Sequence, residues 1–246
     1  MRKIFHLLFI ILALISCSKA KVAVSDKKFP AITLINNYEY FEGKHEFKQL
    51  GCAFLLKYKT DTFAITAKHI LAILKTDSAK SLIIENFVKK WTMTPLNNEN
   101  EVVVVDKLLN ENKEENLKSK KIYEKDWLLF SIKENKTNVI PLEFREKPLI
   151  KGEKLFVVGW TRHMKGGNQR VYEFEFYKTK GTHYLMKKLI IPEKMGGLSG
   201  APVVDNDGKL VGIVSISEFN LFALENMVSP VGIVELKEFL DSHLNK

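Results

Sequence analysis

The chain has few cysteines and no apolar stretch long enough to cross a membrane as a helix. Only Cys17 and Cys52 occur among its 246 residues, so at most one internal disulfide could form and the fold must be supported by burial. The longest apolar run, residues 4–15, is broken by His6 and falls short of the about 20 residues that a transmembrane helix needs. Apolar residues are nevertheless plentiful, at 46% with sixteen Phe, so a large core can form.

Sequence features of cofactor-dependent and nucleic-acid-binding proteins are also missing. The chain has no glycine-rich loop of the kind that cradles phosphates or dinucleotides. His163, His183 and His243 have no Cys, Asp or Glu at metal-ligand spacing, which predicts no metal site and no cofactor. The net charge is +9 but the Lys and Arg residues are spread along the chain, which favours a solvated surface over nucleic-acid binding. A basic surface that faces anionic lipid or an acidic substrate is the alternative.

The N-terminus resembles a bacterial export signal, since a Met-Arg-Lys start precedes the apolar run. Residues 14–17 then read Leu-Ile-Ser-Cys, which resembles a lipobox, whose cysteine is acylated and becomes the first residue. We expect a signal peptide over 1–16 and a lipidated tether over 17–30, with Cys17 anchoring the protein to a membrane of the cell envelope on the periplasmic side. Cys52 would then have no partner and is expected to be a small buried residue. The alternative is an ordinary cleaved signal with a chance cysteine.

The rest of the chain alternates between short apolar stretches and polar turns. From residue 31 the stretches are mostly four to eight residues long and rich in Val, Ile, Phe and Leu, and a second series follows residues 147–152. This pattern predicts an all-β fold of two packed antiparallel β-barrels, an N-terminal one over 31–146 and a C-terminal one over 147–246.

Two segments depart from the strand pattern. Residues 231–244 (VGIVELKEFLDSHL) have helical spacing, which predicts a C-terminal α-helix with Val234, Phe239 and Leu240 on one face. Residues 106–126 are rich in charge and poor in apolar side chains, which predicts an exposed loop.

The most specific motif is GGLSGAPVV at residues 196–204. Small residues around Ser199 would hold its hydroxyl on a tight curve of backbone, and the preceding glycines allow consecutive N–H groups to point inward. The Gly197 and Ser199 N–H groups would then form an oxyanion hole. The alternative is a Gly-Ser-rich turn between two strands, which is common on its own.

A serine nucleophile needs a base, and that base needs an acid. A serine hydroxyl is a poor nucleophile unless a base lies within hydrogen-bond reach, and His69 stands where the apolar strand FAITA ends. The imidazole in turn needs a carboxylate on its other nitrogen to fix the tautomer, and Asp126 directly precedes the apolar WLLF stretch. Each residue also has a structural interpretation, because a lone histidine at a strand end is commonly structural and Asp126 could simply close the charged loop.

In the order His, Asp, Ser, these segments resemble the trypsin/chymotrypsin-like serine endopeptidases, in particular the disulfide-poor bacterial branch that includes the periplasmic heat-shock proteases. Residues 66–69 (TAKH) resemble the T-A-A-H motif, and residues 51–54 (GCAF) resemble the G-x-G-F strand. Residues 126–129 (DWLL) resemble D-hydrophobic-A-L, and residues 197–202 (GLSGAP) resemble G-[DN]-S-G-G-P. The resemblance spans roughly residues 35–243.

The resemblance implies a chymotrypsin-like fold, a polypeptide substrate and specific residue roles. The catalytic triad would consist of His69, Asp126 and Ser199. The strand that pairs with the substrate backbone and lines the specificity pocket would contain Ser215, Ile216 and Ser217. Glu193 stands where trypsin-like members place the residue at the base of that pocket, and an acid there would favour Lys or Arg before the cleaved bond. A solvated glutamate beside Lys194 is the favoured alternative.

The chain also departs from the family pattern at Leu198, Ala201, Lys68, Ala53 and Leu128, but none of these changes removes a catalytic group. Leu198 replaces the Asp or Asn before the serine, which argues against activation by a new N-terminus that pairs with that Asp. We therefore predict an exported, lipid-anchored serine endopeptidase that acts through an acyl-enzyme. The alternative is a catalytically inactive lipoprotein that keeps the fold as a peptide-binding or adaptor module. An esterase that uses the same triad is a minor third hypothesis.

Overall fold

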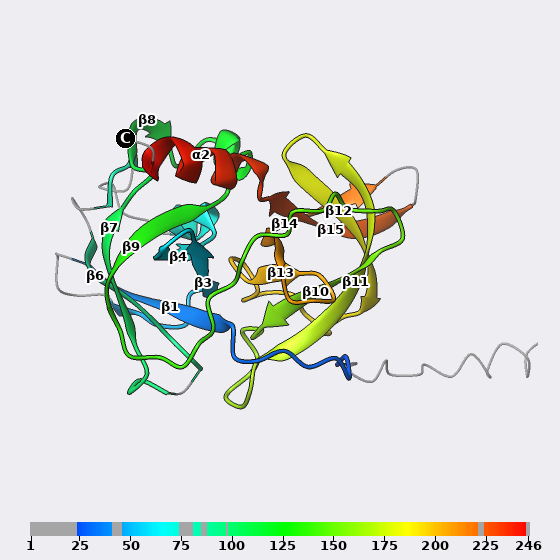
Figure 1. Ribbon diagram of the computed structural model, residues 1–246, viewed down its shortest axis with the longest axis horizontal. Coiled ribbons are helices and arrows are strands. Elements are labelled where there is room, and N and C mark those ends of the chain that lie inside the picture. The colour runs from blue at the N-terminus through cyan, green and yellow to red at the C-terminus, as the bar shows by residue number, and fades with distance from the viewer. Residues whose placement is uncertain are drawn as a thin grey trace, which may run out of the picture.

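The computed structural model describes residues 24–40, 46–73, 81–84, 88–96, 98–220 and 224–244. These residues form two β-barrels that lie side by side, with an α-helix at the C-terminal end (Figure 1). The expected signal peptide and the expected lipidation site, Cys17, lie outside the described residues. Among those described, no helix is long and apolar enough to cross a membrane.

The first barrel is closed by six antiparallel strands in the order β1-β3-β4-β9-β7-β6, with β6 pairing back to β1. A short strand, β2, extends the sheet beside β1, and β5 pairs with β8 in a separate two-stranded sheet. The strands are β1 (Thr33–Tyr40), β2 (Glu46–Phe47), β3 (Cys52–Tyr58), β4 (Asp61–Thr66), β5 (Ser81–Leu82), β6 (Val88–Thr94), β7 (Val103–Leu108), β8 (Asn112–Asn116) and β9 (Leu128–Asn135), and the 3₁₀ helices are η1 (Lys68–Ile73) and η3 (Lys120–Tyr123).

The second barrel closes in the order β10-β11-β12-β15-β14-β13, since β13 pairs back to β10 through Val204 and Phe156. Its strands are β10 (Lys154–Gly159), β11 (Arg170–Lys180), β12 (His183–Ile190), β13 (Pro202–Val204), β14 (Leu210–Asn220) and β15 (Glu225–Gly232), and the helix α2 (Val234–Leu244) follows. The prediction of two antiparallel barrels and a C-terminal helix is therefore confirmed.

An apolar cluster between the barrels holds the two halves together. It joins Phe54 of β3 to Val158 of β10 and Ile213 of β14, and the helix α2 covers it with Leu236 and Leu240, which are fully buried. The expectation that Val234 shares a face with Phe239 and Leu240 was wrong, because Val234 is 60% exposed whereas Leu240 is fully buried. Consecutive helical residues are rotated by about 100°, so Val234 points away from the face that carries Leu236 and Leu240.

The predicted exposed loop over residues 106–126 was only partly correct. It contains strand β8, which pairs with β5, and the 3₁₀ helix η3, whose Ile122 is buried. Most of the β8 side chains are exposed, so backbone pairing rather than burial makes this strand. Apolar periodicity cannot detect such a strand, because its sequence, NKEEN, has no apolar residue.

Residues 24–30, the described part of the expected tether, lie against the second barrel along β10 and β11 (Figure 1). Ser25 donates a side-chain hydrogen bond to Glu173 of β11. The Phe29 ring packs edge-on against Phe156 of β10, with 5.5 Å between ring centroids. This part of the chain therefore belongs to the folded body.

Candidate active site

His69 lies at the edge of the first barrel, where a strand is followed by a short 3₁₀ helix. Strand β4 ends at Thr66 and η1 begins at Lys68, which places the imidazole at the barrel edge with 12% of its side chain exposed. Its Nδ1 lies 2.6 Å from Asp126 Oδ2, and its backbone N–H donates to Asp126 Oδ1 at 2.8 Å. Both contacts therefore fix the ring relative to one carboxylate.

Asp126 is fully buried just before strand β9, and three donors satisfy it. Two donors come from His69, and the third is the hydroxyl of Ser215, on β14 of the other barrel, which donates to Oδ2. An ionised carboxylate can only accept hydrogen bonds, so Nδ1 carries the ring proton and donates it to Asp126 as a hydrogen bond, which leaves Nε2 as the acceptor of the neutral imidazole. The two barrels thus fix the tautomer of His69 together.

Ser199 completes this chain of contacts from the second barrel. Its hydroxyl oxygen lies 2.8 Å from His69 Nε2, within the reach needed for proton transfer. The Ser199 carbonyl accepts a hydrogen bond from Cys52 N at 2.7 Å, so strand β3 of the first barrel holds the serine loop directly. Gly51 must be a glycine here, because its φ is +70° and an added Cβ would lie 2.7 Å from the Ser199 carbonyl oxygen.

Two backbone N–H groups on the loop that carries Ser199 have no acceptor among the described residues. The Gly196 carbonyl accepts from Arg162 N at 2.7 Å, which turns the N–H of the same peptide unit, that of Gly197, away from Arg162. Gly197 has φ +101°, and a Cβ there would lie 2.4 Å from Arg162 N. Within the described residues, neither the Gly197 N–H nor the Ser199 N–H donates to another group of the chain. Both donors are therefore free to bind an oxyanion.

The two departures from the family pattern beside Ser199 are explained by packing. Leu198 and Ala201 are fully buried in the core of the second barrel together with Cys52. Gly159 of β10 makes room for all three, since a Cβ there would lie 3.0 Å from Cys52 Sγ and 3.2 Å from Leu198. Apolar side chains therefore suit positions 198 and 201, and the contact between Ser199 and His69 is kept.

Cys52 is fully buried, as expected, and it also contacts the loop that carries the oxyanion donors. Its Sγ lies 3.4 Å from the Gly197 carbonyl and 3.6 Å from the Trp160 carbonyl. Burial raises the pKa of the Cys52 thiol to about 12, an effect that the hydrogen bond to Trp160 only partly opposes. The thiol is therefore a protonated, inert group.

The residues expected to bind substrate lie in two places. Ser215 is buried against Asp126, whereas Ile216 is half-buried and Ser217 is exposed on the same strand. Glu193 is exposed and lines a surface pocket of about 240 Å³ together with Arg170 and other residues, but none of Ser215 to Ser217 lines that pocket. The geometry favours the interpretation of Glu193 as a solvated residue.

Sequence reasoning missed a buried amide that supports the site from the first barrel. Asn36 of β1 is fully buried and donates to the Cys52 carbonyl at 3.0 Å and to Thr66 Oγ1 at 2.9 Å. Its own oxygen accepts from Trp91 Nε1 at 3.1 Å. Asn36 therefore ties together the strands that lead to His69 and hold Ser199. The sequence signal was the pair Asn36-Asn37, directly after the apolar stretch ITLI.

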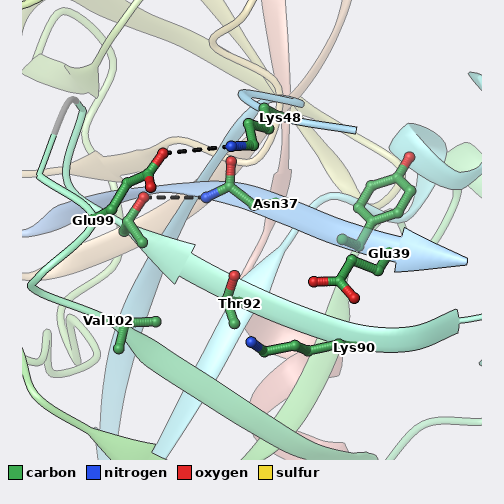
Figure 2. Close-up of a pocket in the computed structure, with 9 residues that line it drawn as sticks. Asn37, Glu39, Lys48, Lys90, Thr92, Glu99 and Val102 are labelled. Atoms are coloured by element: carbon green, nitrogen blue, oxygen red, sulfur yellow. Dashed lines mark hydrogen bonds and ion pairs between the residues drawn. The ribbon is translucent and has the colours of Figure 1, made fainter. Parts of the chain in front are cut away.

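A polar pocket of about 280 Å³ lies on β1 and β6 of the first barrel (Figure 2), and none of the triad residues lines it. Its ion pair, Lys48 with Glu99 at 3.6 Å, joins side chains that are 60% and 81% exposed, and exposed pairs of this kind contribute little. In the same pocket, the Asn37 side-chain amide donates to Thr94 Oγ1 at 3.1 Å. In the part of the chain that the structure describes, no group of three or more His, Cys, Asp or Glu side chains is arranged to hold a metal.

Comparison of this sequence with known sequences finds one short match to a family model. No curated protein matches the chain. A family model described as the CBS domain matches only residues 188–222. In this structure that segment runs from β12 through Ser199 into β14, as part of the closed second barrel, and it is too short to place the chain in that family.

Comparison with solved structures finds serine proteases over nearly the whole chain. The active form of the Rv3671c protease from M. tuberculosis aligns with a TM-score of 0.54 at 13% identity, over 93% of this chain and 92% of that chain. The thermostable serine protease AL20 from an extremophilic microorganism aligns with a TM-score of 0.58 at 13% identity, over 88% and 98%. A serine endoprotease from Yersinia pestis aligns with a TM-score of 0.53 at 14% identity, over 92% of this chain but 65% of that chain. The chain therefore has the chymotrypsin-like fold of these serine proteases.

Proposed function

We propose that this protein is a serine endopeptidase that uses Ser199 as nucleophile, His69 as base and Asp126 as the group that orients His69. The observation that carries the proposal is the continuous chain of contacts from Asp126 through His69 to Ser199, at 2.6 and 2.8 Å. A serine hydroxyl, an imidazole and a buried carboxylate in this order are the parts that acyl transfer requires.

The mechanism follows from these positions. His69 Nε2 takes the Ser199 hydroxyl proton as the oxygen attacks the scissile carbonyl, and Asp126 stabilises the resulting imidazolium. The Gly197 and Ser199 N–H groups bind the oxyanion of the tetrahedral intermediate. His69 then donates its proton to the leaving amine, and an acyl-enzyme forms on Ser199. Water, activated by the same imidazole, releases the acid and restores the hydroxyl.

We also propose that the protein is exported and anchored to a membrane by lipid. The basic start, the apolar run and the Leu-Ile-Ser-Cys sequence at residues 14–17 support export and attachment through lipid on Cys17. The protein would then act on polypeptides at the periplasmic side of a bacterial membrane, as a member of the periplasmic heat-shock-protease-like branch of the family.

Labelling with a fluorophosphonate tests the activity without knowledge of the substrate. The reagent reacts rapidly with a serine only when a base removes the proton and an oxyanion hole stabilises the adduct. We expect stoichiometric labelling at one site, mapped to Ser199 by mass spectrometry. Labelling should be absent in Ser199→Ala and slower by several orders of magnitude in His69→Ala.

A folded wild-type protein that stays unlabelled at pH 8 would instead support the inactive peptide-binding or adaptor module. Rapid labelling together with hydrolysis of esters but not of peptides would support the esterase.

A further inference from the structure

Three lysines gather around one tyrosine on the outside of the second barrel. The ammonium groups of Lys151, Lys178 and Lys187 lie 5.1, 5.6 and 5.3 Å from the centre of the Tyr177 ring. No two of these groups can be farther apart than about 11 Å, which is close to the Debye length in 0.1 M salt. An aromatic ring attracts cations to its face, and the three charges therefore act together on an approaching molecule.

Neighbouring acids offset only part of this charge. Glu175 of β11 lies 3.8 Å from Lys187. Glu153, in the turn before β10, is engaged by the guanidinium of Arg145. The three lysines therefore keep an excess of positive charge, which favours an anionic partner.

Exposed apolar side chains flank the lysines. Ile150, next to Lys151, is 71% exposed, and Leu189 of β12 is 46% exposed. The turn that carries Ile150 is fixed to β11, because the Gly152 N–H donates to the Phe176 carbonyl at 2.8 Å. Lysines, a tyrosine and an exposed aliphatic side chain on one surface form a combination suited to the boundary between water and an anionic bilayer.

The first described residues of the chain bind to the same strand. The Ser25 hydroxyl donates to Glu173 of β11, and the Ser25 N–H donates to the Val171 carbonyl at 3.1 Å. Glu173 and Tyr177 are four residues apart on β11, so about 13 Å of strand separates them. The place where the tether joins the folded body is therefore close to the lysines.

The length of the tether then limits how far this surface can lie from a membrane. With lipid on Cys17, as proposed above, the chain has seven residue steps from the anchor to Val24. Even a fully extended chain spans at most about 25 Å over these steps. An anchored protein would therefore hold this side of the second barrel near the headgroups.

We propose that a lysine patch, formed by Ile150, Lys151, Tyr177, Lys178 and Lys187, binds the anionic headgroups of the bilayer that holds the anchor. The lysines contact lipid phosphates, the Tyr177 ring lies at the level of the headgroups, and Ile150 enters the apolar boundary. The segment that leads into β10 lies on the side of the second barrel away from the first barrel (Figure 1), so this contact directs the first barrel away from the bilayer. The choice of a bilayer as partner rests on the proposed lipid attachment, but the contact itself needs no lipid on Cys17.

The test is co-sedimentation of residues 17–246 carrying Cys17→Ser with lipid vesicles. This chain contains every described element of the fold and carries no lipid, so the result is separate from that of palmitate labelling. Vesicles of phosphatidylcholine are compared with vesicles that also contain phosphatidylglycerol. One lysine near an anionic surface strengthens binding about fivefold, so we expect at least about tenfold tighter binding to the anionic vesicles, a preference that fades in high salt. Equal binding to the two kinds of vesicle would overturn the proposal.

Substitutions locate the surface. The triple variant Lys151→Gln, Lys178→Gln and Lys187→Gln should lower the affinity for anionic vesicles about a hundredfold. A matched control removes the same charge from exposed positions of the first barrel and should bind as the parent does; it carries Lys107→Gln, Lys113→Gln and Lys133→Gln. Equal losses in the two triple variants would show that only net charge acts, and would refute the patch.

Soluble polyglutamate tests the competing partner, an acidic polypeptide. If the parent binds polyglutamate but not the anionic vesicles, and the first triple variant loses that binding, the lysines serve an acidic polypeptide and the membrane proposal is wrong. Fluorophosphonate labelling of Ser199 reports separately on the proposed catalytic function.

Discussion

The carboxylate of Asp126 offers the most direct test of how the triad works, through the substitution Asp126→Asn. In the structure, Oδ1 accepts from the backbone N–H of His69, and Oδ2 accepts from His69 Nδ1 and from the Ser215 hydroxyl. A backbone N–H can only donate, so the single oxygen of the new side-chain amide must take the Oδ1 position. The NH₂ group of that amide then occupies the Oδ2 position, where it donates to His69 Nδ1 and to Ser215.

This exchange reverses the histidine tautomer. With Nδ1 as acceptor, the neutral imidazole carries its proton on Nε2, which faces Ser199 and can no longer remove the hydroxyl proton. We expect the rate of turnover to fall about ten-thousand-fold, equivalent to about 5 kcal/mol in the barrier. The size and shape of the side chain are kept, so the fold should survive.

The assay is the second-order rate of fluorophosphonate labelling at Ser199, with circular dichroism to confirm folding. The control is Asp106→Asn, because Asp106 is the aspartate nearest to Asp126 in sequence but lies exposed on β7 beside Ser131. It should label as the wild type does. A loss of less than tenfold in Asp126→Asn would show that the carboxylate does not set the tautomer, and a large loss in Asp106→Asn would indicate that Asp106 fills the role.

Three further outcomes are expected. In bacteria fed labelled palmitate, the wild-type protein should become labelled and Cys17→Ser should not, and equal labelling of the two would end the lipoprotein proposal. Burial raises the pKa of Cys52 from 9.0 to about 12, so above pH 9 the unfolded state loses a proton that the folded state keeps, and stability should fall with rising pH until about 12. The free energy of unfolding should fall by about 1.4 kcal/mol per pH unit from this group. Urea titrations between pH 9 and 11 should show a weaker dependence on pH in Cys52→Ala than in the wild type. An equal dependence in the two proteins would contradict the burial argument. Glu193→Gln should leave the cleavage preference unchanged in a peptide library, whereas a lost preference for Lys or Arg would place Glu193 in the specificity pocket.

The sequence was sufficient for those parts of the molecule that rest on local patterns. Short apolar strands predicted two barrels, and the fixed spacing of small residues around Ser199 identified the serine loop. Strand β8 escaped prediction because backbone pairing, not apolar side chains, holds it in place. The role of Asn36 also escaped, because its value lies in contacts with β3 and β4 that form only when the barrel closes.

The contacts of Ser215 and the buried face of helix α2 also could not be predicted from local patterns. The resemblance placed Ser215 on the substrate strand, but the bond to Asp126 depends on how one barrel sits on the other. Val234 was placed on one face with Phe239 and Leu240 from helical spacing, whereas packing against the barrels buries Leu236 and Leu240 of α2. Periodicity indicates which residues of a helix share a face, but only long-range packing decides which face is buried.

The division of the site between the barrels has a consequence for how the protein matures. His69 and Asp126 belong to the half that is synthesised first, whereas Ser199 and the Gly197 amide belong to the half that is synthesised last. Neither half alone holds both the proposed nucleophile Ser199 and its base His69, so a growing chain lacks the assembled triad. On the proposed chemistry, proteolytic competence arises only when the finished second half docks, and a destructive activity is thereby kept silent until folding is complete.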